Sequence, residues 1–179
     1  MARRYDPDRR QRIIDAAIRV VAERGIEALS HRTVAAEADV PLGSTTYHFA
    51  TLDDLLVAAL RQVCTEPGMA VPTWRRAVEG PAPLADAIAD LLLDAARDDH
   101  GEVRLAYELY LAALRREALR PVAAEWLEAV VAVLVPRTGD EASARALLAL
   151  ADGLMLQALL SGRRLDRAEV REALARVAG

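Results

Sequence analysis

Apolar residues recur along most of the chain at the spacing of one helix face. The first such stripe repeats at i, i+3, i+4, i+7 and i+8 and consists of Ile13, Ala16, Ala17, Val20 and Val21. This period is typical of an amphipathic helix. Gly25 follows directly, as glycine often does after a helix end. The pattern therefore predicts a first helix over about 7–24.

Capping residues divide the next segment into short helices. Ser30 predicts the start of a helix that reaches about Ala38, and a turn then leads to a second helix over 42–48. Thr51 caps a fourth helix, whose first turn carries Asp53 and Asp54, where carboxylates suit the helix dipole.

The rest of the chain is also helical in pattern. Residues 66–83 contain four of the eight prolines and two glycines, so we expect a connection there, with a short helical piece around Trp74. Beyond it, apolar periodicity predicts five helices, over about 83–98, 103–117, 119–134, 141–161 and 166–177. Pro136 and Gly139 are expected to end the third of these. The fold class is all-α, with about nine helices.

Composition agrees with packed helices. Hydrophobic residues make up 53% of the chain and aromatic residues only 4%. Residues 1–50 carry eight arginines against seven acidic residues, whereas residues 51–179 carry fifteen against twenty. A basic arm around Arg3 and Arg4 on an acidic body suits a local anionic partner, although it could also be a solvated tail.

Several functions find no support in the residues. Cys64 is the single cysteine, so an intrachain disulfide is excluded, and the thiol is either a buried structural group or a sensor. His31, His48 and His100 lack metal-ligand spacing, and we expect no metal and no cofactor. No nucleophile–base pair or phosphate loop points to an enzyme. The N-terminus lacks the apolar stretch of a signal peptide, and the longest uninterrupted apolar run, Ala129–Val135, is too short to cross a bilayer, so we expect a cytoplasmic protein without membrane contact.

The segment 42–48 has unusual chemistry for a helix that only packs. Its sequence, LGSTTYH, is rich in hydroxyl groups and ends in two polar aromatic residues. Two short helices joined by a tight turn form a helix-turn-helix, whose second helix lies in the DNA major groove. Serine, threonine, tyrosine and histidine can reach bases or phosphates there.

The stretch from Gly25 to Leu56 resembles the N-terminal domain of TetR-family regulators. It supplies the glycine that ends helix 1, the Ser30 cap, the Val34-Ala35 pair and the His48-Phe49 pair. It departs from the family pattern at the turn, where glycine is usual and Asp39 stands. Thr45-Thr46 replace a Leu-Tyr pair, and Leu52 replaces a lysine that commonly meets phosphate.

The resemblance implies a helix-turn-helix DNA-binding domain over 1–50 and an effector-binding and dimerisation domain over 51–179, linked by the fourth helix. The DNA contacts that it implies are Ser30, His31, Arg32, Thr33, Gly43, Ser44, Thr46, Tyr47 and His48. Arg32 is the best candidate for a bidentate guanine contact. We assign Phe49 to the core.

The C-terminal part carries weaker signals. The segment LLALADGLMLQALL resembles the family's penultimate helix, which implies a homodimer interface that contains Leu150, Gly153, Leu154 and Gln157. Residues suited to an effector pocket are Trp74, Tyr107, Tyr110, Leu111, Leu114, Trp126 and Gln157, although aromatic residues at helical spacing can equally be plain core. If the tyrosine hydroxyls are buried, we expect Gln157 or a ligand oxygen to pair with them, and we expect a mostly apolar effector with one or two hydrogen-bonding groups.

The leading hypothesis is a ligand-responsive regulator, a repressor that an apolar effector releases from a near-palindromic double-stranded DNA operator. The same architecture can also activate transcription. A helical enzyme or small-molecule carrier is one alternative. A protein-interaction module whose helix-turn-helix has lost its DNA is another, which the leucine at position 52 and the acidic body keep open.

Overall fold

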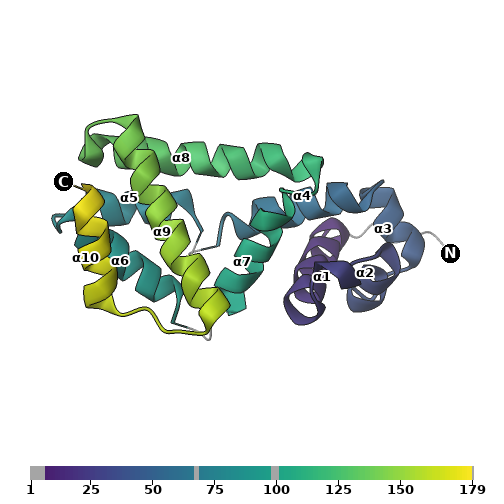
Figure 1. Ribbon diagram of the computed structural model, residues 1–179. Coiled ribbons are helices and arrows are strands. Elements are labelled where there is room, and N and C mark those ends of the chain that lie inside the picture. The colour runs from purple at the N-terminus through teal and green to yellow at the C-terminus, as the bar shows by residue number, and fades with distance from the viewer. Residues whose placement is uncertain (1–6, 67–68, 98–100, 179) are drawn as a thin grey trace.

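Helices account for all the regular secondary structure in the residues that the structure, a computed structural model, describes: 7–66, 69–97 and 101–178. The molecule is elongated, with α1, α2 and α3 at one end and the later helices at the other (Figure 1). The expected all-α fold class is confirmed, with ten α-helices and two 3-10 helices in this part of the chain. Arg3, Arg4 and His100 lie outside the described residues.

The first helix, α1 (Arg9–Arg24), buries the stripe that the sequence pattern predicted. Gly25 ends it with a φ of +78°, and its N–H donates to the carbonyl of Val21. After it come η1 (Ile26–Ala28), α2 (His31–Glu37) and α3 (Leu42–His48). These short elements pack against α1, so the helix-turn-helix rests on a single long helix.

The turn between α2 and α3 explains one departure from the family pattern. Asp39 has a φ of +51°, in the left-handed region that favours glycine. Aspartate enters this region more readily than most other residues, because its short polar side chain can hydrogen-bond locally. The turn therefore keeps its left-handed backbone with Asp39 where the family pattern has glycine.

The fourth helix, α4 (Leu52–Val63), joins the two ends of the molecule. It begins with a reciprocal cap, in which the Thr51 and Asp54 side chains each accept from the other's backbone N–H. One side of α4 packs on α1 and another contacts α7 and η2. The helices α1, α2 and α3 are therefore joined to the C-terminal helices through α4.

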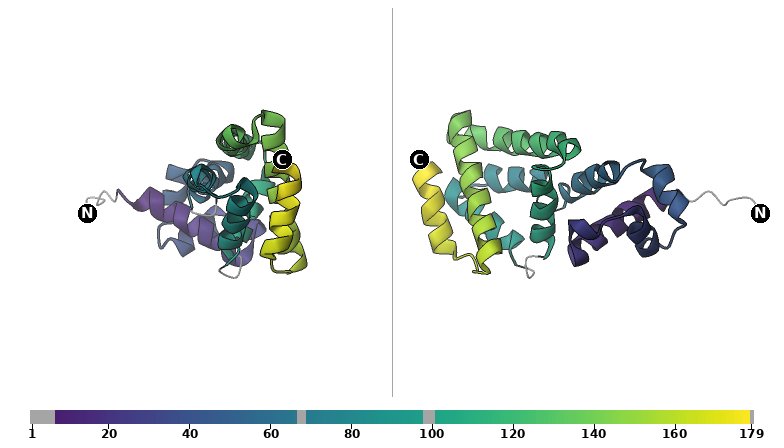
Figure 2. Two further views of the ribbon diagram at one scale, coloured as in Figure 1. Left: turned by 90° about the vertical axis from the view of Figure 1, so that its left-hand side faces the viewer. Right: turned by 45° about the vertical axis from the view of Figure 1, so that its right-hand side comes forward.

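The C-terminal helices form layers around a common core. They are α5 (Val71–Glu79), α6 (Leu84–Ala95), α7 (Gly101–Ala112), η2 (Glu117–Leu119), α8 (Arg120–Thr138), α9 (Glu141–Ser161) and α10 (Arg167–Ala178). α10 packs on α6 and α9, while α8 packs on α5 and α9 (Figure 2). Arg167 and Arg171 reinforce the first contact through ion pairs with Asp86.

Two predicted helix ends are wrong. α8 continues through Pro136 to Thr138, because a proline in the last turn frees only one carbonyl. Gly139, with a φ of +87°, ends the helix instead. α7 ends at Ala112 rather than near 117, and a turn and η2 replace its expected last turn.

Candidate DNA-binding surface and ligand cavity

The short helix α3 has one outward face and one inward face. Gly43 and Thr46 are exposed, Leu42 is 47% exposed and Tyr47 is 84% exposed. A large aromatic side chain seldom projects so far into solvent without a partner surface. This face is the one that a major groove would meet.

Ser44 does not belong to that face. Its side chain is only 3% exposed, and its hydroxyl oxygen has no hydrogen-bond partner in the described part of the chain. The prediction that Ser44 contacts DNA through its side chain is therefore corrected, because α3 turns this position toward the helices that pack on it. Thr45, its buried neighbour, donates to the Leu42 carbonyl at 2.7 Å.

The start of α2 places a free cation beside α3. Ser30 and Thr33 form a capping box, so their hydroxyls hold the helix end. Arg32 is exposed and makes no hydrogen bond or ion pair with any described residue. On the other side of α2, Glu37 binds Arg19 at 2.8 Å and Arg24 at 3.5 Å, which fixes α2 to α1.

The remaining predicted residues of this surface lie at its edges. His31 and His48 are partly buried, and the His31 Nδ1 has no partner among the described residues. Phe49 is 3% exposed, as its assignment to the core requires, and the Arg10 guanidinium lies 5.0 Å from its ring centre. Leu52 is partly buried against the core. Because leucine is uncharged, it cannot replace the phosphate contact of the lysine that is common at this position.

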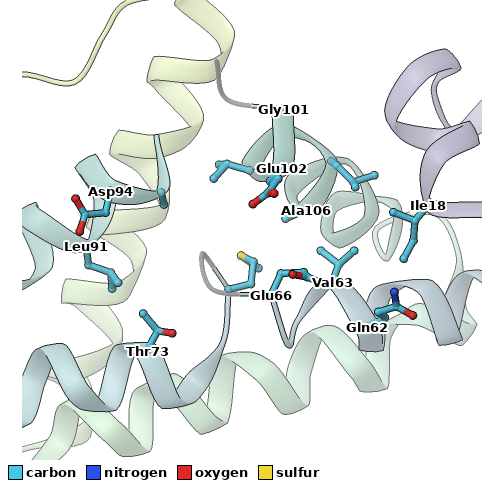
Figure 3. Close-up of a pocket in the computed structure, with 14 residues that line it drawn as sticks. Ile18, Gln62, Val63, Glu66, Thr73, Leu91, Asp94, Gly101, Glu102 and Ala106 are labelled. Carbon is cyan, nitrogen blue, oxygen red and sulfur yellow. The ribbon is translucent and has the colours of Figure 1, made fainter. Parts of the chain in front are cut away.

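A cavity of about 590 Å³ opens where α1, α4, α5, α6 and α7 meet (Figure 3). α1 contributes Ile18 and α4 contributes Gln62 and Val63. The remaining lining is Glu66, Met69, Thr73, Leu91, Asp94, Ala95, Gly101, Glu102, Val103, Leu105 and Ala106. A ligand in this cavity would therefore touch both the DNA-side helix α1 and the C-terminal helices.

A smaller chamber of about 20 Å³ shares four walls with this cavity and lies deeper in the core. The shared walls are Met69, Leu91, Ala95 and Val103. Three of the predicted pocket residues line it, namely Trp74, Tyr107 and Trp126. Tyr110 packs edge-on against both Tyr107 and Trp126. The structure thus brings the predicted aromatic residues together.

Asp152 supplies the charge of the inner chamber. The Tyr107 hydroxyl donates to its Oδ1 at 2.8 Å. Desolvation raises the pKa of Asp152, although the bond from Tyr107 opposes that shift. Burial also raises the pKa of Tyr107, and the neighbouring carboxylate adds to the effect. Trp74 is 4% exposed, and its Nε1 has no partner among the described residues.

Three predicted pocket residues lie elsewhere. Leu111 is 37% exposed on the outer side of α7, and Leu114 is 74% exposed in the turn that follows the helix. Gln157 is exposed and lines a surface groove between α9 and α10. Gln157 was one expected hydrogen-bond partner of the tyrosine hydroxyls, but the Tyr107 hydroxyl donates to Asp152.

Sequence reasoning missed the carboxylates of the cavity. Asp152 lies in the segment that resembles the family's penultimate helix and received no role of its own there, although a lone acid inside an apolar helix was a usable signal. Glu66, Asp94 and Glu102 lie at the ends of separate helices, and only the fold brings them to one opening. Cys64 lies outside this lining, and burial raises the pKa of its thiol to about 11.

The predicted dimer residues share one region of α9. Leu150, Gly153 and Leu154 are partly buried and Gln157 is exposed. By length and composition α9 would also suit a membrane span, with a third of its apolar window buried in the protein. α8, α10 and α6 cover part of the helix, and the rest is an apolar surface available to another molecule.

Both halves of the chain match models of one family. Residues 13–59 match the model described as bacterial regulatory proteins, tetR family. Residues 79–179 match a model described as tetracyclin repressor-like, C-terminal domain. The chain belongs to the TetR family. TetR-family proteins are DNA-binding transcriptional regulators rather than enzymes. The surface formed by α2 and α3 is the candidate for the DNA contacts.

Curated relatives of this TetR-family chain are regulators. The nicotine-responsive transcriptional repressor HdnoR of Paenarthrobacter nicotinovorans is 29% identical over 84% of the chain and 83% of the relative. The regulator BetI of Burkholderia mallei is 31% identical over 88% of the chain and 85% of its own length.

Solved structures are more similar still. The multidrug binding protein EbrR in complex with ethidium is 58% identical, with a TM-score of 0.87 over 97% of this chain and 99% of EbrR. The TetR-family protein SCO1917 from Streptomyces coelicolor A3 is 59% identical, with a TM-score of 0.84 over 96% and 98%.

Proposed function

We propose that this TetR-family regulator is a dimeric repressor that leaves its operator when an aromatic organic cation enters the cavity. The negative charge of the cavity and of the inner chamber is the strongest support for the proposal. Their lining includes the carboxyl groups of Glu66, Asp94, Glu102 and Asp152, and no basic side chain among the described residues that line them. Asp94 pairs with Arg97 at 3.0 Å, whereas Glu66, Glu102 and Asp152 form no ion pair with any described residue. Acids without a basic partner in a partly apolar site favour a cation.

The walls favour an organic cation over a metal ion. The described residues contain no group of three or more His, Cys, Asp or Glu side chains that could hold a metal. Tryptophan and tyrosine rings surround the inner chamber, and aromatic faces attract organic cations. A volume of about 590 Å³ lies in the range of small-molecule sites.

The proposal revises the expectation of a mostly apolar effector. That expectation depended on the side chains of α7 alone, whereas α9 brings Asp152 to the same place. EbrR has been crystallised with ethidium and with malachite green, which are both aromatic cations. The similarity over nearly the whole chain supports carrying this ligand class to the present protein.

On the DNA side, the proposal assigns base contacts to Arg32 and to the exposed face of α3. Each subunit presents one such face, and a homodimer presents two to successive major grooves. An effector releases the operator when it favours a separation of the two faces that mismatches the grooves. The regulator would act on DNA in the cytoplasm.

The test compares malachite green with leucomalachite green, its uncharged reduced form of similar size. We expect the cation to bind at least about tenfold more tightly, which corresponds to about 1.4 kcal/mol. Gel shifts with the DNA directly upstream of the gene should show release over the same range of dye concentration. Equal affinity for the two dyes would contradict the assigned ligand class.

A reporter gene behind the same DNA gives the sign of regulation. Expression that rises with the dye supports a repressor, and expression that falls supports the activator alternative. A protein that binds no DNA in the gel shift would support the interaction-module alternative.

A further inference from the structure

Two neighbouring residues of α7 face two different parts of the molecule. The Tyr107 hydroxyl donates to Asp152 of α9 at 2.8 Å, in the inner chamber. The next residue, Glu108, accepts a hydrogen bond from the Ile26 backbone N–H at 2.6 Å. Successive residues of an α-helix are rotated by about 100°, so one helix can hold both partners at once. Figure 1 shows α7 between α9 and α1.

The bond to Ile26 continues into the helix-turn-helix. Ile26 opens η1, and Ala28 ends it. The Ala28 carbonyl accepts from the Thr33 hydroxyl at 2.9 Å, and Thr33 belongs to the capping box that starts α2. α2 carries the exposed Arg32 and packs on α3. Hydrogen bonds therefore connect α7 with the first DNA-facing helix through η1.

The Glu108 contact is well suited to transmit a displacement. It is partly buried and pairs a carboxylate with a backbone N–H, a combination stronger than a neutral hydrogen bond. The N-terminal half of α7 lines the large cavity with Gly101, Glu102, Val103, Leu105 and Ala106. A ligand in the cavity would therefore contact the same helix that binds η1 through Glu108.

We propose that α7 carries the effector signal to the DNA-binding domain through Glu108, by a route separate from the α4 connection. The inference depends on the proposed function for the effector, but the hydrogen bonds that define the route do not. In this route, displacement of α7 moves η1 and thereby reorients α2 against α3. Glu108 acts as a positioning residue that touches neither DNA nor ligand.

The first experiment measures coupling in the full-length protein. Coupling is the ratio of operator Kd values with and without saturating malachite green, and such ratios are typically about 5- to 150-fold in allosteric proteins. Glu108→Ala removes the acceptor and should lower the ratio at least about threefold. The dye Kd of the DNA-free protein should change less than about twofold, because Glu108 does not line the cavity.

Two further variants serve as controls. Glu108→Gln keeps an acceptor oxygen and should restore most of the coupling. Arg104→Ala removes an exposed charge from the same helix and should leave the ratio at the wild-type value. Wild-type coupling in a folded Glu108→Ala protein would overturn the proposal.

The second experiment needs no effector, so it separates the inference from the proposed function. Tyr107→Phe releases the cavity end of α7 from Asp152 and should change operator affinity. The same substitution should have an effect at least about threefold smaller when Glu108→Ala is also present, because the link to η1 is gone. Equal effects in both backgrounds would overturn the route. A wild-type protein that ignores malachite green would contradict the proposed ligand class alone.

Discussion

Asp152 illustrates how a half-buried acid can contribute to binding at a cost in stability. The carboxyl group lies in an aromatic chamber with one hydrogen bond, from Tyr107. Desolvation raises its pKa above 3.8. Between that value and the raised one, the folded protein holds a proton that the unfolded chain has lost. The contribution of Asp152 to the free energy of unfolding therefore falls as the pH rises through this interval.

We predict that Asp152→Asn raises the melting temperature at pH 7 and weakens malachite green binding about tenfold or more. The amide keeps the Tyr107 hydrogen bond and removes the charge. Thermal unfolding from pH 4 to 7 should show a smaller decline in stability with rising pH than in the wild type. A variant that binds the dye with unchanged affinity would show that Asp152 is structural only.

Two of the residues that the sequence analysis grouped as DNA contacts differ in exposure, since Arg32 is exposed and Ser44 is buried. We predict that Arg32→Ala weakens operator binding by about 1–3 kcal/mol and relaxes preference at one base position per half-site. Ser44→Ala is the matched control, because this buried hydroxyl lacks a partner and its loss should leave DNA affinity unchanged. Gel shifts with operator and random DNA measure both. Equal losses on the two DNAs would mean that Arg32 meets only phosphate.

At the scale of elements, apolar periodicity predicted the helices well because each helix buries one stripe. The prediction of one helix end failed because tertiary contacts outweighed the local tendency of proline to end a helix. Pro136 was expected to stop α8, but Arg137 in the same turn donates to the carbonyls of Val78, Gly80 and Ala82. Those bonds hold the last turn of α8 against the end of α5, which sequence spacing alone does not reveal.

The helix α9 carries more apolar surface than its own subunit covers. A side chain at Gly153 would meet no atom within 4 Å in the single chain. We therefore predict that Gly153→Arg leaves the subunit folded but yields monomers, and that operator binding collapses because a single half-site gains too little. Sedimentation velocity measures the association state, and Ala124→Arg, at an exposed position of α8, is the control. A dimeric Gly153→Arg protein would place the interface elsewhere.

At the scale of the whole molecule, the fold class was predictable because caps, glycines and stripes are local signals. The grouping of Tyr107 with Tyr110 was predictable too, since a spacing of three residues places both rings on one helix face. Their acidic partner was not, because Asp152 lies 45 residues beyond Tyr107 and meets it only after α9 packs. The large cavity was not predictable either, since five separate helices contribute to its walls.

The half-buried carboxyl group of Asp152 also has a consequence for the lifetime of the protein in a cell. A ligand that binds only the folded state and neutralises this charge lowers the fraction of unfolded chains. Proteases that degrade unfolded chains then remove fewer copies. The compound that lifts repression would thus also conserve the repressor. Cells exposed to the compound would therefore contain more folded regulator, which could bind the operator again once the compound is removed.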